Sequence, residues 1–249
     1  MIAYTVRTHP RARHVRLRFD PHQGLIVTVP KRFDQRRLPA LIAQRKAWIE
    51  AMQVRHAQLR QARNPELFGT RPGRIELPAI GESWSIAYAA RSSRRLGFGQ
   101  DQGQGHLVFR LPEQPPGDID QRIAQRLKRW LIDRASQTLK PRVAELARQH
   151  GFRHGPIAIR CQRARWGSCS ARGHLSLNAR LLFASPEACR YVLIHELVHT
   201  EHLDHSPAFW RRVASLDPDY QVHQAQLNAV WQQLPDWLHR ASAPRAVGA

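Results

Sequence analysis

The sequence predicts an α+β protein in two parts, a β-rich N-terminal region over residues 1–117 and a mostly helical domain over residues 118–240. Two patterns predict this class. Before residue 112, apolar residues alternate with polar ones in short runs, as in half-buried strands. After residue 118, they recur every three to four residues, as in amphipathic helices. The chain has 249 residues, which is enough to bury a sizeable core.

The N-terminal region begins with strands and continues with one long helix. Three alternating runs predict the strands: 2–6, 15–19 and 25–29. Asp34 is a suitable N-cap for a helix over residues 35–60, whose apolar positions follow a 3.6-residue period. Pro39 leaves the first residue of that helix open.

Further strands are expected between residues 74 and 112, followed by a domain boundary. The stretch GQDQGQG (99–105) predicts an exposed flexible loop, and PEQPPGD (112–118) predicts a linker. Asp118 and Gln121 then resemble a capping box that begins a long amphipathic helix. Pro141 should kink or split this helix, and Gly151 suits its C-terminal cap.

The last part of the chain alternates short strands and helices. Strands are expected at residues 157–161 and 174–178, joined by a turn-rich segment over 167–173. Three helix starts follow, the first two with Pro at the first helical position: Ser185-Pro186, Ser206-Pro207 and Asp219. Residues 241–249, ASAPRAVGA, are expected to be a disordered tail.

Charge and cysteine usage restrict the class of protein. The net charge is +20, and residues 122–180 hold 14 basic against 2 acidic side chains, which favours an anionic partner or a general preference for arginine. Residues 185–240 reverse the sign, with 4 basic against 7 acidic. The three cysteines form no CxxC pair, and no apolar run is long enough to span a membrane. A cytoplasmic protein with reduced thiols and no membrane partner is expected.

The most informative motif is His195-Glu196-Leu197-Val198-His199, an HExxH sequence on a predicted helix. Residues i and i+4 share one helix face about 6 Å apart, so both imidazoles can reach one Zn²⁺. Glu196 lies about 100° around the helix, where a general base for a zinc-activated water belongs. A chain of this His and Glu content contains HExxH by chance in roughly 0.03 of cases.

Tetrahedral zinc that also holds a water needs a third protein ligand. His202 continues the same helix face, but it lies about 10.5 Å along the axis from His195. Two ligand nitrogens of one zinc are only about 3.4 Å apart. His205 fits if the helix stops near residues 203–204, as the new helix start at Ser206-Pro207 requires. The carboxylate alternatives are Asp217 and Asp219.

Three stretches around this motif carry a family resemblance: RWGSCS (165–170), Leu177-Asn178 and YVLIHELVHTEHLDHSPAFW (191–210). They resemble the YgjP-like metal-dependent hydrolases, relatives of the SprT-like metallopeptidases. The resemblance implies a zincin-like fold of the small-gluzincin type, in which an active-site helix packs on a small sheet. It also implies the metal site HExxHxxxxxH on His195, His199 and His205, with Glu196 as the catalytic acid/base.

These observations favour a zinc-dependent hydrolase, most simply a metallopeptidase with one Zn²⁺, other divalent metals being alternatives. Four residues are candidates for supporting or substrate-binding roles: Arg165, Trp166, Tyr191 and His202. Two other functions stay open: a metal-dependent nucleoside triphosphate pyrophosphatase, and a basic nucleic-acid-binding module with a structural zinc. The sequence leaves the substrate, peptide or nucleotide, and the oligomeric state undetermined.

Overall fold

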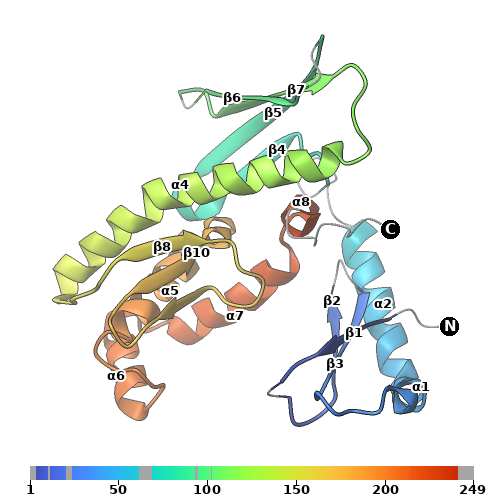
Figure 1. Cartoon of the computed structure of the whole chain (residues 1–249). Helices are drawn as coiled ribbons and strands as arrows, with labels where there is room; N and C mark the ends of the chain where they lie inside the picture. The colour runs from blue at the N-terminus through green and yellow to red at the C-terminus, as the bar shows by residue number, and fades with distance from the viewer. Residues whose placement is uncertain are drawn as a thin grey trace. The chain divides into compact units, whose positions relative to one another are not determined.

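The computed structural model describes residues 4–10, 12–20, 24–61, 69–92, 95–101 and 103–240 (Figure 1). The chain divides into two compact units, Met1–Asn64 and Pro65–Ala249. The sequence places the boundary later, at residues 117–118. It lies earlier in the structure because the strands over 74–112 bury their apolar side chains in the same core as the helices that follow.

The first unit contains the three expected strands: β1 (Tyr4–Thr8), β2 (Arg16–Asp20) and β3 (Gly24–Val29). They form a sheet in the order β1-β3-β2, with β1 parallel and β2 antiparallel to β3. Every second residue of β3, from Leu25 to Val29, is buried in a small core with Leu38, Ile42 and Ile49. The period-two pattern of the sequence therefore correctly predicts the buried face.

The single helix expected over residues 35–60 is three segments: η1 (Gln35–Arg37), α1 (Leu38–Gln44) and α2 (Lys46–Gln61). Asp34 is the cap, since its Oδ1 accepts a hydrogen bond from the Arg36 N–H at 3.0 Å. The break falls at Arg45, whose φ of −105° and ψ of 13° lie outside the helical region. Trp48, assigned to the apolar face, is 41% exposed.

The second unit begins with a four-stranded sheet formed by β4 (Arg74–Leu77), β5 (Glu82–Arg91), β6 (Gly97–Asp101) and β7 (His106–Pro112), with η2 (Pro78–Ile80) between β4 and β5. The strand order is β4-β5-β7-β6, and only the β5–β7 pair is parallel. The predicted loop over 99–105 is wrong in its first part. Residues 99–101 belong to β6, because backbone pairing with β7 gives order to a stretch without apolar side chains.

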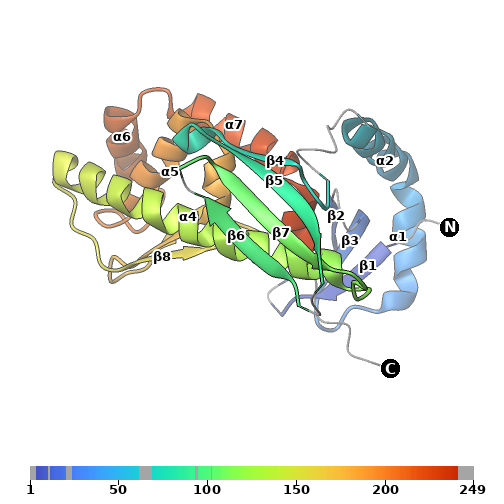
Figure 2. The ribbon, with the colours of Figure 1, turned by 90° about the horizontal axis from the view of Figure 1, so that it is seen from above.

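The helix α4 (Ile119–His150) lies between this sheet and the rest of the second unit (Figures 1 and 2). It remains one continuous helix of 32 residues, so the split expected at Pro141 does not occur. The capping box is also wrong: both carboxylate oxygens of Asp118 accept from Arg122 Nε at 3.0 Å instead of capping the backbone. Gly151 ends the helix at a φ of 75°, as expected.

A second sheet and five helical segments complete the unit. The strands are β8 (Ile157–Arg160), β9 (Gly167–Cys169) and β10 (Leu175–Asn178), in the order β8-β10-β9. The helical segments are η3 (Ala179–Phe183), α5 (Pro186–Val198), α6 (Pro207–Leu216), α7 (Tyr220–Gln232) and α8 (Asp236–Arg240). β9 is an edge strand where the sequence predicts only turns.

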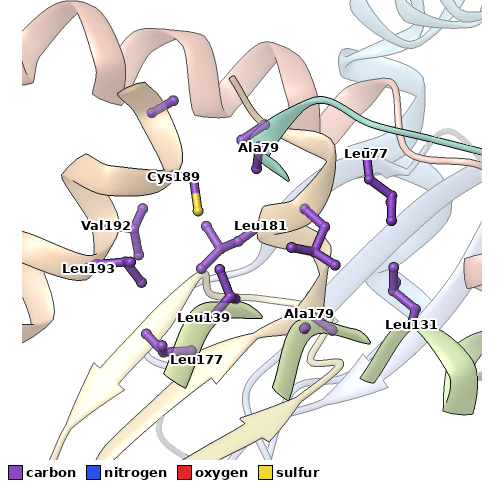
Figure 3. Close-up of a cluster of buried hydrophobic side chains, with 14 of the residues drawn as sticks. Leu77, Ala79, Leu131, Leu139, Leu177, Ala179, Leu181, Cys189, Val192 and Leu193 are labelled. Atoms are coloured by element: carbon purple, nitrogen blue, oxygen red, sulfur yellow. The ribbon is translucent and has the colours of Figure 1, made fainter. Parts of the chain in front are cut away.

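The core of the second unit surrounds α5. Side chains from α4, β10, η3 and α5 meet there, among them Leu139, Leu177, Leu181 and Val192 (Figure 3). α8, which the sequence did not predict, packs on α4 and buries Trp237 completely. In the described part of the chain, no helix is long and apolar enough to cross a membrane. The expected tail, 241–249, lies outside the described residues.

Candidate metal centre

A loop between α5 and α6 carries His205, and both helices begin at the caps expected from the sequence. α5 starts at the expected cap, where Ser185 Oγ accepts from the Ala188 N–H at 3.1 Å. It ends at Val198, earlier than the sequence predicts, and the chain turns through residues 199–205. α6 then starts at the second expected cap, Ser206, whose Oγ accepts from the Phe209 N–H at 3.4 Å. His205 therefore lies between two helices and is free to point back at α5.

The turn brings three histidines together. Ring nitrogens of His195, His199 and His205 all lie within 4.8 Å of one another. Nε2 of His205 is 3.1 Å from Nε2 of His195. Among the described residues, no other group of His, Cys, Asp and Glu meets the same criterion for holding a metal ion. Of the candidates for the third position, the structure brings His205 to the pair and leaves the side chains of His202, Asp217 and Asp219 out of the cluster.

The Nδ1 atoms of the two helical histidines already have partners. Tyr191 OH is 3.4 Å from His195 Nδ1, and His199 Nδ1 donates to the backbone carbonyl of His202 at 2.9 Å. Burial and the neighbouring His199 and His205 lower the pKa of His195 to about 3, and burial lowers the pKa of His199. Both rings are therefore neutral near pH 7, and His195 presents Nε2 to His205.

A stack of aromatic rings packs against His205, the exposed member of the histidine cluster. Tyr191 stacks on Tyr220 at 6.4 Å between ring centroids, Tyr220 on Trp210 at 5.2 Å, and Trp210 on His205 at 5.6 Å. The three interplanar angles lie between 23° and 27°. The sequence pattern singles out neither Trp210 nor Tyr220 as a residue of the site. Position could have identified Trp210, because it follows His205 within the first turn of the next helix.

Glu196 occupies a buried position beside the histidines. The residue is 5% exposed, and in the described part of the chain its Oε2 has no hydrogen-bond partner. Burial raises the pKa of this carboxyl to about 8, while Arg165 opposes the shift. Glu196 packs directly on Gly167 of β9, where a Cβ would lie 2.7 Å from Glu196 Cγ and Cδ. Glycine at this position therefore makes room for the carboxylate.

A cleft of about 260 Å³ opens beside Glu196 and His195. Its lining comes from the β9 segment, α5 and α7: Trp166, Gly167, Tyr191, Val192, His195, Glu196, Gln224, Leu227 and Asn228. Trp166 is half-buried and packs edge-on against Trp231 at 4.6 Å. Of the supporting residues proposed from sequence, Trp166 and Tyr191 line the cleft. Arg165 and His202 are not among its lining residues.

Asn178 fixes the segment that leads into β9. Its Nδ2 donates to the carbonyls of Gln162 and Arg165, at 3.0 and 2.7 Å, and its own N–H donates to the Trp166 carbonyl at 2.8 Å. Asn178 is fully buried at the end of β10. Asn178 therefore holds in place the segment that leads to Trp166 and Gly167, two residues that line the cleft. The Leu177-Asn178 pair in the sequence does not reveal this role.

One comparison with known proteins shows the family of this chain. A family model described as YgjP-like, metallopeptidase domain, matches residues 13–230. The chain belongs to the YgjP-like metallopeptidase family. The match extends across both compact units and includes the histidine cluster. The family resemblance seen in the sequence is therefore confirmed. The chain is a mixed α/β metallopeptidase in which a group of three histidines could hold a divalent cation.

No curated protein matches this YgjP-like chain. Among solved structures, it is similar to one described as the crystal structure of the metallopeptidase zymogen of Pyrococcus abyssi abylysin. The two share 23% sequence identity at a TM-score of 0.35, over 39% of this chain and 99% of that chain.

Proposed function

We propose that this YgjP-like protein is a zinc-dependent peptidase, with His195, His199 and His205 as the metal ligands and Glu196 as the general base. The observation that carries the proposal is a cluster of three imidazoles beside the buried carboxyl group of Glu196, whose Oε2 has no hydrogen-bond partner among the described residues. A buried ionisable group without a partner is costly to keep unless it has a function.

The donor atoms fit a zinc ion. The separation of 3.1 Å between Nε2 of His195 and His205 is close to the roughly 3.4 Å expected for two nitrogen ligands of one tetrahedral zinc. Imidazole ligands favour zinc over magnesium or calcium, which prefer oxygen. When bound, zinc supplies a Lewis acid and lowers the pKa of a bound water to about 7.

The ligand count favours a catalytic over a structural ion. A structural zinc site is usually closed by four protein ligands. In the described part of the chain, no fourth His, Cys, Asp or Glu joins the three histidines. The fourth position would therefore be open to water or substrate, which supports hydrolysis rather than a structural zinc in a nucleic-acid-binding module.

The residues around the cleft would share the steps of peptide hydrolysis. Glu196 would take a proton from the attacking water and release it to the leaving amine, because its carboxyl lines the cleft together with His195. Tyr191 would hold the His195 ring through Nδ1, so it acts as a positioning residue. Arg165 and His202 are the other candidates from sequence for stabilising negative charge on the scissile carbonyl oxygen, and neither lines the cleft.

The free edge of β9 would hold the substrate. Among the strands that the structure describes, β9 pairs only with β10, and it lies against Glu196 through Gly167. An extended peptide can add to such an edge through backbone hydrogen bonds, which places one of its peptide bonds beside the carboxylate. This arrangement favours peptides over nucleotides as substrates.

Metal content and activity test the proposal together. We expect one zinc per chain, loss of tight zinc binding in His205→Ala, and wild-type binding in the matched control His202→Ala. Glu196→Gln should keep the zinc and lose hydrolysis of fluorescein-labelled casein by at least about 100-fold. Full activity of Glu196→Gln, or hydrolysis of nucleoside triphosphates with Mg²⁺ in place of casein, would show that the proposed function is wrong.

A further inference from the structure

A second cavity, of about 560 Å³, lies between the end of α4 and the start of α5. Four apolar side chains contribute to its lining: Pro141, Leu146, Pro186 and Leu193. Its volume falls within the roughly 300–1,000 Å³ of sites that bind small organic ligands. The proposed peptidase reaction uses none of these residues.

The cavity is on the opposite face of α5 from the metal centre. Pro186, Arg190 and Leu193 are spaced four and three residues apart, so they share one face of the helix. His195 follows Pro186 by nine residues, which at about 100° per residue places it roughly 180° around the helix. A ligand in this cavity would therefore be separated from the histidines by the body of α5.

Two arginines, Arg142 and Arg190, also line the cavity beside its apolar residues. Arg142 Nη1 donates to the Ala79 carbonyl at 2.6 Å, and Arg190 Nη1 donates to the Leu216 carbonyl at 3.3 Å. Each guanidinium is thus attached to the backbone through one nitrogen and keeps further N–H donors. Within the described residues, neither arginine forms an ion pair with a carboxylate.

Two carboxylates near these arginines, Glu145 and Glu82, are already bound by other groups. Glu145 also lines the cavity, but its Oε1 accepts from Arg148 Nη2 at 2.7 Å and from Gln149 Nε2 at 2.8 Å. Glu82, which attracts Arg142 electrostatically, is bound by Arg134. Arg142 and Arg190 therefore leave the cavity with an unbalanced positive charge.

We propose that this cavity binds a small organic anion with an apolar body, such as a medium-chain carboxylate. The apolar lining would take the body of the ligand, and the free N–H donors of Arg142 and Arg190 would take its carboxylate. A charge-assisted bond between guanidinium and carboxylate is among the stronger hydrogen bonds available to a protein. The unbalanced charge of the lining distinguishes this ligand from a neutral apolar molecule or an apolar side chain of a partner protein.

Fluorescence titration of the full chain without added metal tests the site. The probe is 8-anilinonaphthalene-1-sulfonate, an anion with an apolar body, whose emission rises in apolar surroundings. We expect saturation at one probe per chain and displacement by decanoate, with 1-decanol displacing it at least about tenfold less effectively. Equal displacement by decanoate and 1-decanol would overturn the proposal, because the site would then recognise only apolar surface.

Variants locate the binding. The double variant Arg142→Gln/Arg190→Gln, and each single variant, should bind the probe at least about tenfold more weakly. Gln149→Trp, which fills the cavity and keeps both arginines, should also lose binding. Arg129→Gln, the same change on an exposed part of α4, should bind as wild type does. Wild-type affinity in either the arginine variants or Gln149→Trp would place the ligand elsewhere and refute the proposal.

Discussion

Replacing Gly167 by alanine tests the link between β9 and the proposed base. The added Cβ would lie 2.7 Å from both Cγ and Cδ of Glu196, whereas ordinary contacts of a Cβ begin near 3.4 Å. Glu196 must therefore move by at least about 0.7 Å, because the backbone of β9 is held by its pairing with β10. A displacement of about 1 Å at a catalytic group can cost about 100-fold in rate.

The assay separates a displaced base from a lost metal or a lost fold. We expect Gly167→Ala to cleave fluorescein-labelled casein about 10- to 100-fold more slowly than wild type. Zinc affinity, measured by competition with a chelator, should change little, and the free energy of unfolding should fall by about 1–3 kcal/mol. Gly117→Ala is the control, since a Cβ there meets nothing within 4 Å. Unchanged activity in Gly167→Ala would refute the packing argument.

Three further variants probe the surroundings of the site and the fold. Trp210→Leu should weaken zinc binding about 10- to 100-fold by freeing the His205 ring, while Trp210→Phe retains most of the affinity in the same chelator competition. Ser206→Ala should lower the free energy of unfolding in urea by about 1 kcal/mol, because α6 loses its cap. Glu82→Gln should lower it by about 1–2 kcal/mol at pH 7, where the partly buried pair with Arg134 is lost. Burial raises the pKa of Glu82, but the hydrogen bond from Arg134 opposes this and the pKa stays below the usual 4.5. The difference in the free energy of unfolding between wild type and Glu82→Gln is therefore fully present above pH 4.5, and it shrinks as the pH falls further.

Local signals in the sequence predict many of the helix starts and stops. Asp34, Ser185 and Ser206 all cap helical segments through the side-chain bonds that their chemistry predicts. Gly151 ends α4 in the left-handed conformation. These predictions succeed because a cap involves only the residue itself and neighbours within three or four positions along the chain.

Predictions fail where a distant segment decides the local structure. Residues 99–101 form a strand because β7 provides their hydrogen-bond partners. α4 continues past Pro141 with buried side chains on either side of it, at Leu139 and Val143. Burial against the rest of the second unit outweighs the local preference to break.

Local signals in the sequence are sufficient to predict the cluster of three histidines and the helix break that precedes His205. Spacing within one helix puts His195 and His199 on a common face, and the start of the next helix requires a turn before His205. Those inferences depend only on bond geometry over a few residues. The surroundings of these histidines become visible in the folded chain: β9 lies against Glu196, Tyr220 and Trp210 stack towards His205, and a charged cavity lies behind α5. Such contacts join residues far apart in the chain, and a single sequence holds no local signal for them because they arise from packing.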